Sequence, residues 1–84
     1  MVILDGNLMC DKNSIFEYIC KQLDHKGICC KNIDGLHDVL SEKNVNITIL
    51  NSTEMLNSLK SYGCKILKCF FDWSNESGNV FILK

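Results

Sequence analysis

Three short apolar runs stand out along the chain, Val2–Leu4, Ile47–Leu50 and Val80–Leu83. Each is almost continuously apolar rather than alternating, which is typical of strands covered on both faces in a parallel sheet. The segments between them carry apolar residues at helical spacing, and they predict the order strand, two helices, strand, two helices, strand. Parallel strands need crossovers of this length. The pattern therefore predicts one α/β domain over residues 1–84, with a three-stranded parallel sheet covered by about four helices.

Polar residues mark where the first two helices begin and end. Ser14 and Glu17 fit a capping box at the start of the first helix, which is expected to stop near Gly27. Asn32 is a good N-cap for the second helix.

Two more helices are predicted after the second strand. A helix is predicted from about Ser52 to Leu59, with Asn51 and Glu54 as a capping pair. Another is predicted from Tyr62 to about Asn75, with an apolar stripe along one face.

The second helix has two contrasting faces. Its apolar residues share one sector of a helical wheel: Ile33, Leu36, Val39 and Leu40. On the opposite side, Asp34, Asp38 and Glu42 follow one another at four-residue spacing with no cation between them, although like charges at this spacing cost about 0.2–0.5 kcal/mol per pair. One interpretation is a solvated surface softened by Lys31 and Lys43 at the helix ends; the other is a binding face for a cationic partner.

Charge and composition exclude several classes of function. The net charge is −1 and arginine is absent, whereas direct nucleic-acid binding calls for a clustered basic face. No apolar run approaches the roughly 20 residues needed to span a membrane. The first residues do not resemble a secretion signal, so the expected location is the cytoplasm.

Six cysteines raise the question of thiol or metal chemistry. In a reducing compartment free thiols are expected, with Cys20 and Cys69 acting as small buried hydrophobes. Cys29 and Cys30 are adjacent, and Cys64 and Cys69 are five apart, so neither pair has a usual zinc-ligand spacing. No metal or cofactor is therefore predicted, and a thiol- or metal-responsive module using Cys29, Cys30, Cys64 and the histidines stays as an alternative.

Catalysis is a further alternative for the paired carboxylates. Two nearby carboxylates can act as general acid and base, but that chemistry needs a concave pocket, whereas Asp34 and Asp38 are expected on the open face of a short helix. His37 is expected to be a partly covered surface histidine, and Asp72 is placed to pair with Lys68 four residues before it. The chain is therefore not expected to be an enzyme.

The stretch NIDGLHDVL, Asn32–Leu40, resembles the N-L-D-x-L-x-D-x-L helix of the barstar family, the intracellular inhibitors of the secreted bacterial ribonuclease barnase. The resemblance extends over nearly the whole chain, through the strands VILDG, NITIL and VFILK and the aromatic helix before the last of them. It implies a three-layer α/β protein whose second helix and preceding loop block the active site of a small basic ribonuclease.

The resemblance also implies roles for individual residues. Asp38 would take the place of the RNA phosphate, Asn32 and Asp34 would make flanking polar contacts, and Asp72 would reach a basic residue at the rim of the enzyme. The aspartates of the second helix would then repel one another in the free protein because they are arranged for a cationic partner.

Some positions depart from the family pattern. Ile28, Cys29 and His37 stand where family members have aromatic residues that pack against the enzyme. The loss leaves open a barstar-like interaction module with a different partner. The predicted partner-binding residues are Ile28, Cys29, Asn32, Asp34, His37, Asp38, Glu42 and Asp72. The free protein is expected to be a monomer. Protonation of His37 is expected to make binding depend on pH between about 5.5 and 8.

Overall fold

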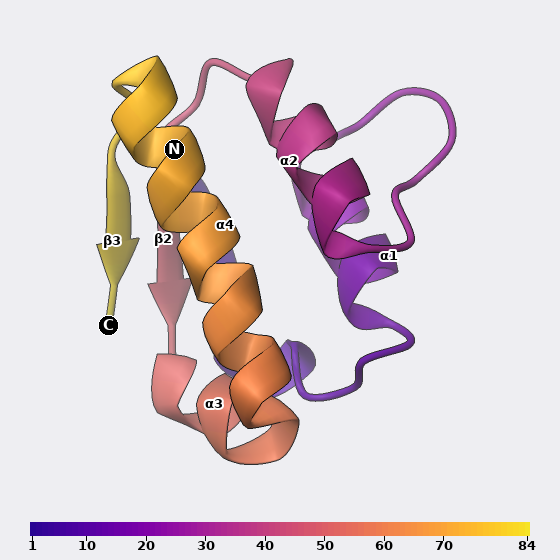
Figure 1. Ribbon diagram of the computed structural model, residues 1–84, viewed down its shortest axis with the longest axis vertical. Coiled ribbons are helices and arrows are strands. Elements are labelled where there is room, and N and C mark those ends of the chain that lie inside the picture. The colour runs from indigo at the N-terminus through magenta and orange to yellow at the C-terminus, as the bar shows by residue number, and fades with distance from the viewer.

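The computed structural model describes residues 1–84 and has the α/β architecture expected from the sequence (Figure 1). In chain order its elements are β1 (Val2–Asp5), a short 3-10 helix η1 (Gly6–Leu8), α1 (Ile15–Gln22), α2 (Ile33–Ser41), β2 (Ile47–Leu50), α3 (Ser52–Leu59), α4 (Ser61–Ser77) and β3 (Phe81–Leu83). The predicted number, type and order of strands and long helices are confirmed. No helix is both long and apolar enough to cross a membrane.

The three strands form a parallel sheet in the order β1-β2-β3. Val2, Ile47 and Phe81 stand side by side in the register, as do Leu4, Ile49 and Leu83. Side chains alternate between the faces of a strand, so these residues share one face. The helix α4 packs on it, with the ring of Phe70 stacked on Phe81 at 5.0 Å between centroids.

The opposite face of the sheet is only partly covered. It carries Ile3, Thr48 and Ile82, and the two isoleucines are 53% and 39% exposed, while Thr48 on the central strand is buried. The prediction of strands covered on both faces is therefore right for β2 and wrong for the edge strands. Apolar residues alone did not distinguish the two cases, because β-branched side chains favour strands whether or not a layer covers them.

The core lies between the sheet and the helices. Its largest fully buried side chains include Trp73 and Phe70 of α4, Ile15 and Ile19 of α1, and Leu36 and Leu40 of α2. Phe16 of α1 meets Tyr62 of α4 edge to face at 6.4 Å. In Figure 1, α2 lies beside α4 on the side away from β3, and α3 lies at the end of the molecule where β2 leads out of the sheet. This packing presents the outer side of α2 to solvent.

Two of the predicted helix caps are wrong. The side chain of Ser14 makes no capping bond, and the chain is turned into α1 by Asp11, whose carbonyl oxygen accepts a bond from the Ile15 N–H at 3.0 Å. The side chain of Asn51 also makes no cap, because its backbone is left-handed (φ 54°) and its amide donates to Asp5 Oδ1 at 3.1 Å. The first helix also ends earlier than expected, with Leu23 as its C-cap and Asp24 left-handed (φ 53°).

Gly6 explains how the chain leaves β1. A Cβ atom at this position would lie 2.1 Å from the carbonyl oxygen of Asn51. Only glycine allows the two backbones to approach this closely. The contact fixes the ends of β1 and β2 against each other.

Candidate partner-binding surface

The start of α2 is set by Asn32, as predicted. Its backbone is extended (φ −151°, ψ 175°), and its side-chain oxygen accepts a hydrogen bond from the Gly35 N–H at 2.7 Å. This is N-cap geometry, and it puts Asp34 in the first turn, where the helix dipole favours a negative charge.

The two faces of α2 are divided as the helical wheel indicates. Leu36, Val39 and Leu40 are buried against the core. Asp34 and Asp38 are exposed, and Glu42 is the exposed C-cap residue. None of these three carboxylates is paired with a basic side chain in the chain, where the pairs are Lys26–Asp24, Lys68–Asp72 and the hydrogen-bonded His37–Glu76.

A groove of about 410 Å³ runs between α2 and α4. Its lining residues are Ile33, Asp34, His37, Lys65, Lys68, Cys69 and Asp72. The fold thus brings together three of the predicted site residues, Asp34, His37 and Asp72, from segments far apart in the sequence. Asp38 and Glu42 are outside the groove, farther along the exposed side of α2.

A hydrogen-bonded pair and an ion pair lie at this groove. His37 Nε2 lies 2.9 Å from Glu76 Oε1, and Lys68 Nζ lies 3.1 Å from Asp72 Oδ2. The second pair was expected from its four-residue spacing, whereas Glu76 was missed. The signal that could have pointed to Glu76 is its position one helical turn after Asp72 on α4. Exposed pairs of this kind are worth about 0–1 kcal/mol, so a partner can compete for them.

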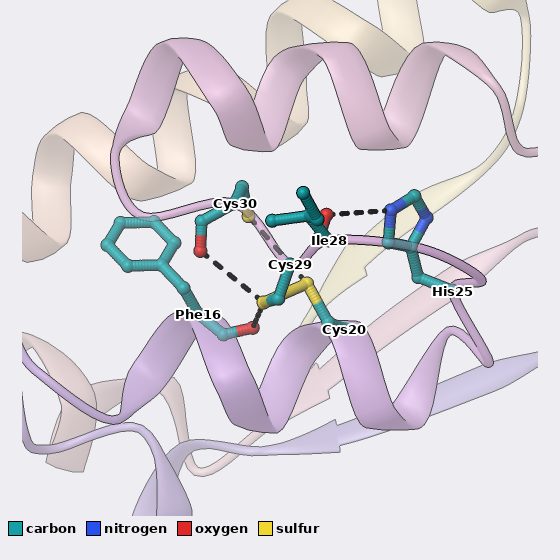
Figure 2. Close-up of a disulfide and its surroundings, with 6 residues drawn as sticks. All are labelled: Phe16, Cys20, His25, Ile28, Cys29 and Cys30. Carbon is teal, nitrogen blue, oxygen red and sulfur yellow. Dashed lines mark hydrogen bonds between the residues drawn. A yellow bond between two sulfur atoms is a disulfide. The ribbon is translucent and has the colours of Figure 1, made fainter.

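The loop before α2 holds the other predicted contacts. Ile28 is 89% exposed, so a partner can reach it. Cys29 is half-buried and forms a disulfide with Cys20 of α1 (Figure 2). The expectation of free thiols is therefore wrong for Cys20 and Cys29. The last turn of α1 faces this loop and brings the two Cα atoms to 5.9 Å, a separation that a disulfide spans.

A family model described as Barstar (barnase inhibitor) matches residues 1–83. The chain belongs to the barstar family. A comparison with individual curated proteins finds no match. Barstar-family membership connects the chain with inhibition of a ribonuclease rather than with catalysis, and it agrees with the sheet and the four helices described above.

The barstar-family helix keeps a close contact with the loop before it. A Cβ atom on Gly35 would lie 2.9 Å from the Cβ of Cys30. Glycine here lets the loop pack directly on the first turn of α2. The position of Cys30 is therefore coupled to the turn that carries Asp34.

The thiol cluster differs from the one considered in the sequence. The sulfur atoms of Cys20, Cys29 and Cys30 lie within 4.8 Å of one another, while Cys64 is exposed on α4 and outside the group. Thiolate ligands suit soft metal ions such as Zn²⁺. These three residues could hold such an ion only after reduction of the disulfide, because a disulfide sulfur carries no thiolate charge.

Cys69 lines the groove but is poorly suited to chemistry. It is buried, and its Sγ lies 3.8 Å from the carbonyl oxygen of Ile33. Burial, followed by the charge of Asp72, raises the pKa of Cys69 to about 11. A thiol that stays protonated at neutral pH is a weak nucleophile and a weak metal ligand.

Proposed function

We propose that this barstar-family protein inhibits a small basic ribonuclease by placing the carboxylates of α2 in its active site. The observation that carries the proposal is the exposed stripe of Asp34, Asp38 and Glu42, none of which is paired within the chain. Asp38 takes the position of the RNA phosphate, as the family resemblance implies. The chain itself has no catalytic role in this function.

The energetics favour a cationic partner. In the free protein the three carboxylates repel one another at four-residue spacing, and their charge is only screened by solvent. A ribonuclease active site that binds phosphate offers positive charge to each of them. Binding then removes repulsion and adds attraction, and the long-range part of the attraction speeds the encounter.

The remaining site residues extend the contact surface. Asn32 and Asp34 lie at the start of α2, with Asp34 one turn before Asp38. Asp72 supplies a carboxylate from the α4 wall of the groove, and Glu76 of α4 lies beside His37. Ile28 offers the exposed apolar side chain of the preceding loop in place of a family aromatic residue. Cys29 contributes by holding this loop through its disulfide rather than by a free thiol.

The setting follows from the proposed activity. A bacterial cell that makes a secreted ribonuclease needs an inhibitor in its cytoplasm to protect its own RNA before export. The free inhibitor acts as a monomer, because its binding face is charged and is not complementary to a second copy of itself.

The test is a titration of the purified protein into barnase while RNA cleavage is followed at low and moderate salt. We expect inhibition that saturates near one equivalent and weakens as salt is added. Asp38→Ala should weaken inhibition at least about 30-fold, since loss of a central interface residue costs about 2 kcal/mol or more. The barnase–barstar pair is itself a known case of a dominant interface aspartate, so the larger effect measured there belongs to that pair and is not predicted for this chain.

Glu54→Ala is the matched control, because it removes one exposed carboxylate from α3 and leaves α2 intact. It should inhibit like the unmodified chain. Undiminished RNA cleavage in the presence of excess protein would contradict the proposal, and so would equal losses in the two variants.

A further inference from the structure

Three sulfur atoms from two segments meet beside the start of α2. Cys20 lies in the last turns of α1, and Cys29 and Cys30 lie in the loop that leads into α2 (Figure 2). The disulfide joins Cys20 to Cys29, and Cys30 Sγ lies 3.8 Å from Cys20 Sγ. A free thiol at this distance from a disulfide sulfur is within reach for thiol–disulfide exchange. All three sulfur atoms lie within 4.8 Å of one another and so form a triangle, and the displacement, which needs them nearly in line, follows a rotation of the cysteine side chains.

The surroundings of Cys29 suit a thiol as well as a disulfide. Its Sγ lies 3.1 Å from the carbonyl oxygen of Phe16 and 3.3 Å from that of Cys30 (Figure 2). A disulfide sulfur has no hydrogen to donate to these oxygens. A released Cys29 thiol would have two acceptors already in place.

We propose that Cys20, Cys29 and Cys30 form a thiol–disulfide exchange site in which Cys20 is bonded alternately to Cys29 and to Cys30. The Cys30 thiol loses its proton to solvent, and the thiolate attacks Cys20 Sγ. The Cys30–Cys20 bond forms as the Cys20–Cys29 bond breaks, and Cys29 leaves as a thiolate that takes a proton from solvent. One disulfide and one thiol are present before and after, so no oxidant or reductant is consumed.

The Cys29 and Cys30 sulfur atoms are accessible to solvent, but the exchange is expected to be slow at neutral pH. Cys29 and Cys30 line a hollow of about 380 Å³ together with Lys12 and Lys31, whereas Cys20 is buried. Burial raises the pKa of the Cys30 thiol, so little of the attacking thiolate is present at pH 7. Both exchanging partners of Cys20 can be reached by an alkylating reagent.

The exchange changes what supports α2. Cys30 packs directly under Gly35 in the first turn, so moving the disulfide from Cys29 to Cys30 shifts the loop against the turn that carries Asp34. The effect on inhibition rests on the proposed function. The exchange itself does not.

The first experiment uses two variants of the full chain, oxidised in a glutathione redox buffer and digested with trypsin. Cys20 falls in the peptide Asn13–Lys21, and Cys29 and Cys30 fall together in Gly27–Lys31, so each variant leaves one possible partner. We expect Cys30→Ser to give a Cys20–Cys29 link and Cys29→Ser to give a Cys20–Cys30 link. Cys64→Ser, which removes an exposed thiol outside the cluster, should leave the mapping unchanged.

The second experiment uses the unmodified protein and needs no variant to fold. The oxidised protein is held at mildly alkaline pH, quenched in acid and labelled with N-ethylmaleimide, and the linked peptide is sequenced by mass spectrometry. Exchange places the label on Cys30 in some molecules and on Cys29 in others. Label on Cys30 alone, or a Cys29→Ser chain that forms no link to Cys20, overturns the proposal.

A final comparison separates this proposal from the proposed function. The oxidised Cys30→Ser and Cys29→Ser proteins are titrated into barnase under the conditions used above. A several-fold difference in inhibition supports control of α2 by the disulfide, and equal inhibition overturns that control. If neither protein inhibits, the proposed function fails, while the peptide mapping still decides the exchange.

Discussion

At the scale of single residues, Asp5 joins three segments at the end of β1. Its Oδ1 accepts hydrogen bonds from the Asn7 N–H at 2.9 Å and from the Asn51 side chain at 3.1 Å, and its backbone N–H donates to the Tyr18 hydroxyl at 2.9 Å. The bonds from Asn51 and then Asn7 favour the ionised carboxyl and lower the pKa of Asp5 below its ordinary value of 3.8.

This lowered pKa predicts a pH-dependent contribution to stability. The ionised Asp5 stabilises the fold above pH 3.8, and the contribution is lost as the pH falls through the lower pKa of the folded state. Asp5→Asn should therefore have a lower Tm than the unmodified protein at pH 7, and the difference should shrink as the pH falls below 3.8. Thermal unfolding at pH 7 and over a series of acidic pH values measures it, and an undiminished difference in acid would contradict the assignment.

At the scale of elements, the start of α2 depends on its cap. Asn32→Ala removes the acceptor of the Gly35 N–H bond and should lower the free energy of unfolding by about 1 kcal/mol. Asn32→Asp keeps a capping oxygen and should retain most of this stability. Urea unfolding followed by the fluorescence of the buried Trp73, the single tryptophan, measures both variants. Similar losses for the two substitutions would show that the cap contributes little.

The elements also show what could be read from the sequence. The boundaries of β2 and α3 were predicted to the residue, and the cap of α2 was correct, because apolar spacing and a local side-chain bond decide them. The cap at Ser14 failed because its backbone is already helical (φ −103°, ψ −11°) rather than extended. The cap at Asn51 failed because its side chain is used by a contact from elsewhere in the chain, the bond to Asp5.

The candidate surface likewise has one part that the sequence predicts and another part that it does not. The acidic stripe of α2 follows from helical spacing alone. The His37–Glu76 pair joins residues 39 apart, and the Cys20–Cys29 disulfide joins residues nine apart through a loop. The His37–Glu76 pair depends on how α2 packs against α4, and the disulfide depends on how the loop folds back on α1. No local sequence pattern specifies either arrangement.

At the scale of the whole molecule, a short chain has little stability to spare. A protein of 84 residues is expected to be stable by roughly 4–13 kcal/mol. One face of its sheet leaves Ile3 and Ile82 exposed, so part of the apolar surface contributes little to the core. A covalent link between α1 and the loop before α2 therefore matters to the entire fold as well as to the surface beside it.

The length of the closed loop decides how much the disulfide contributes to the free energy of unfolding, and whether exchange alters that contribution. Closing a loop of about ten residues removes unfolded-state entropy worth about 2–3 kcal/mol, and shifting the bond by one residue changes this by only about 0.1 kcal/mol. Oxidised Cys29→Ser and Cys30→Ser should thus have similar free energies of unfolding, and each should lose about 2–3 kcal/mol on reduction. Cys20→Ser should be insensitive to the reductant. A large gap between the two oxidised variants would mean that one pairing distorts the fold, and the disulfide would then stay with a single partner.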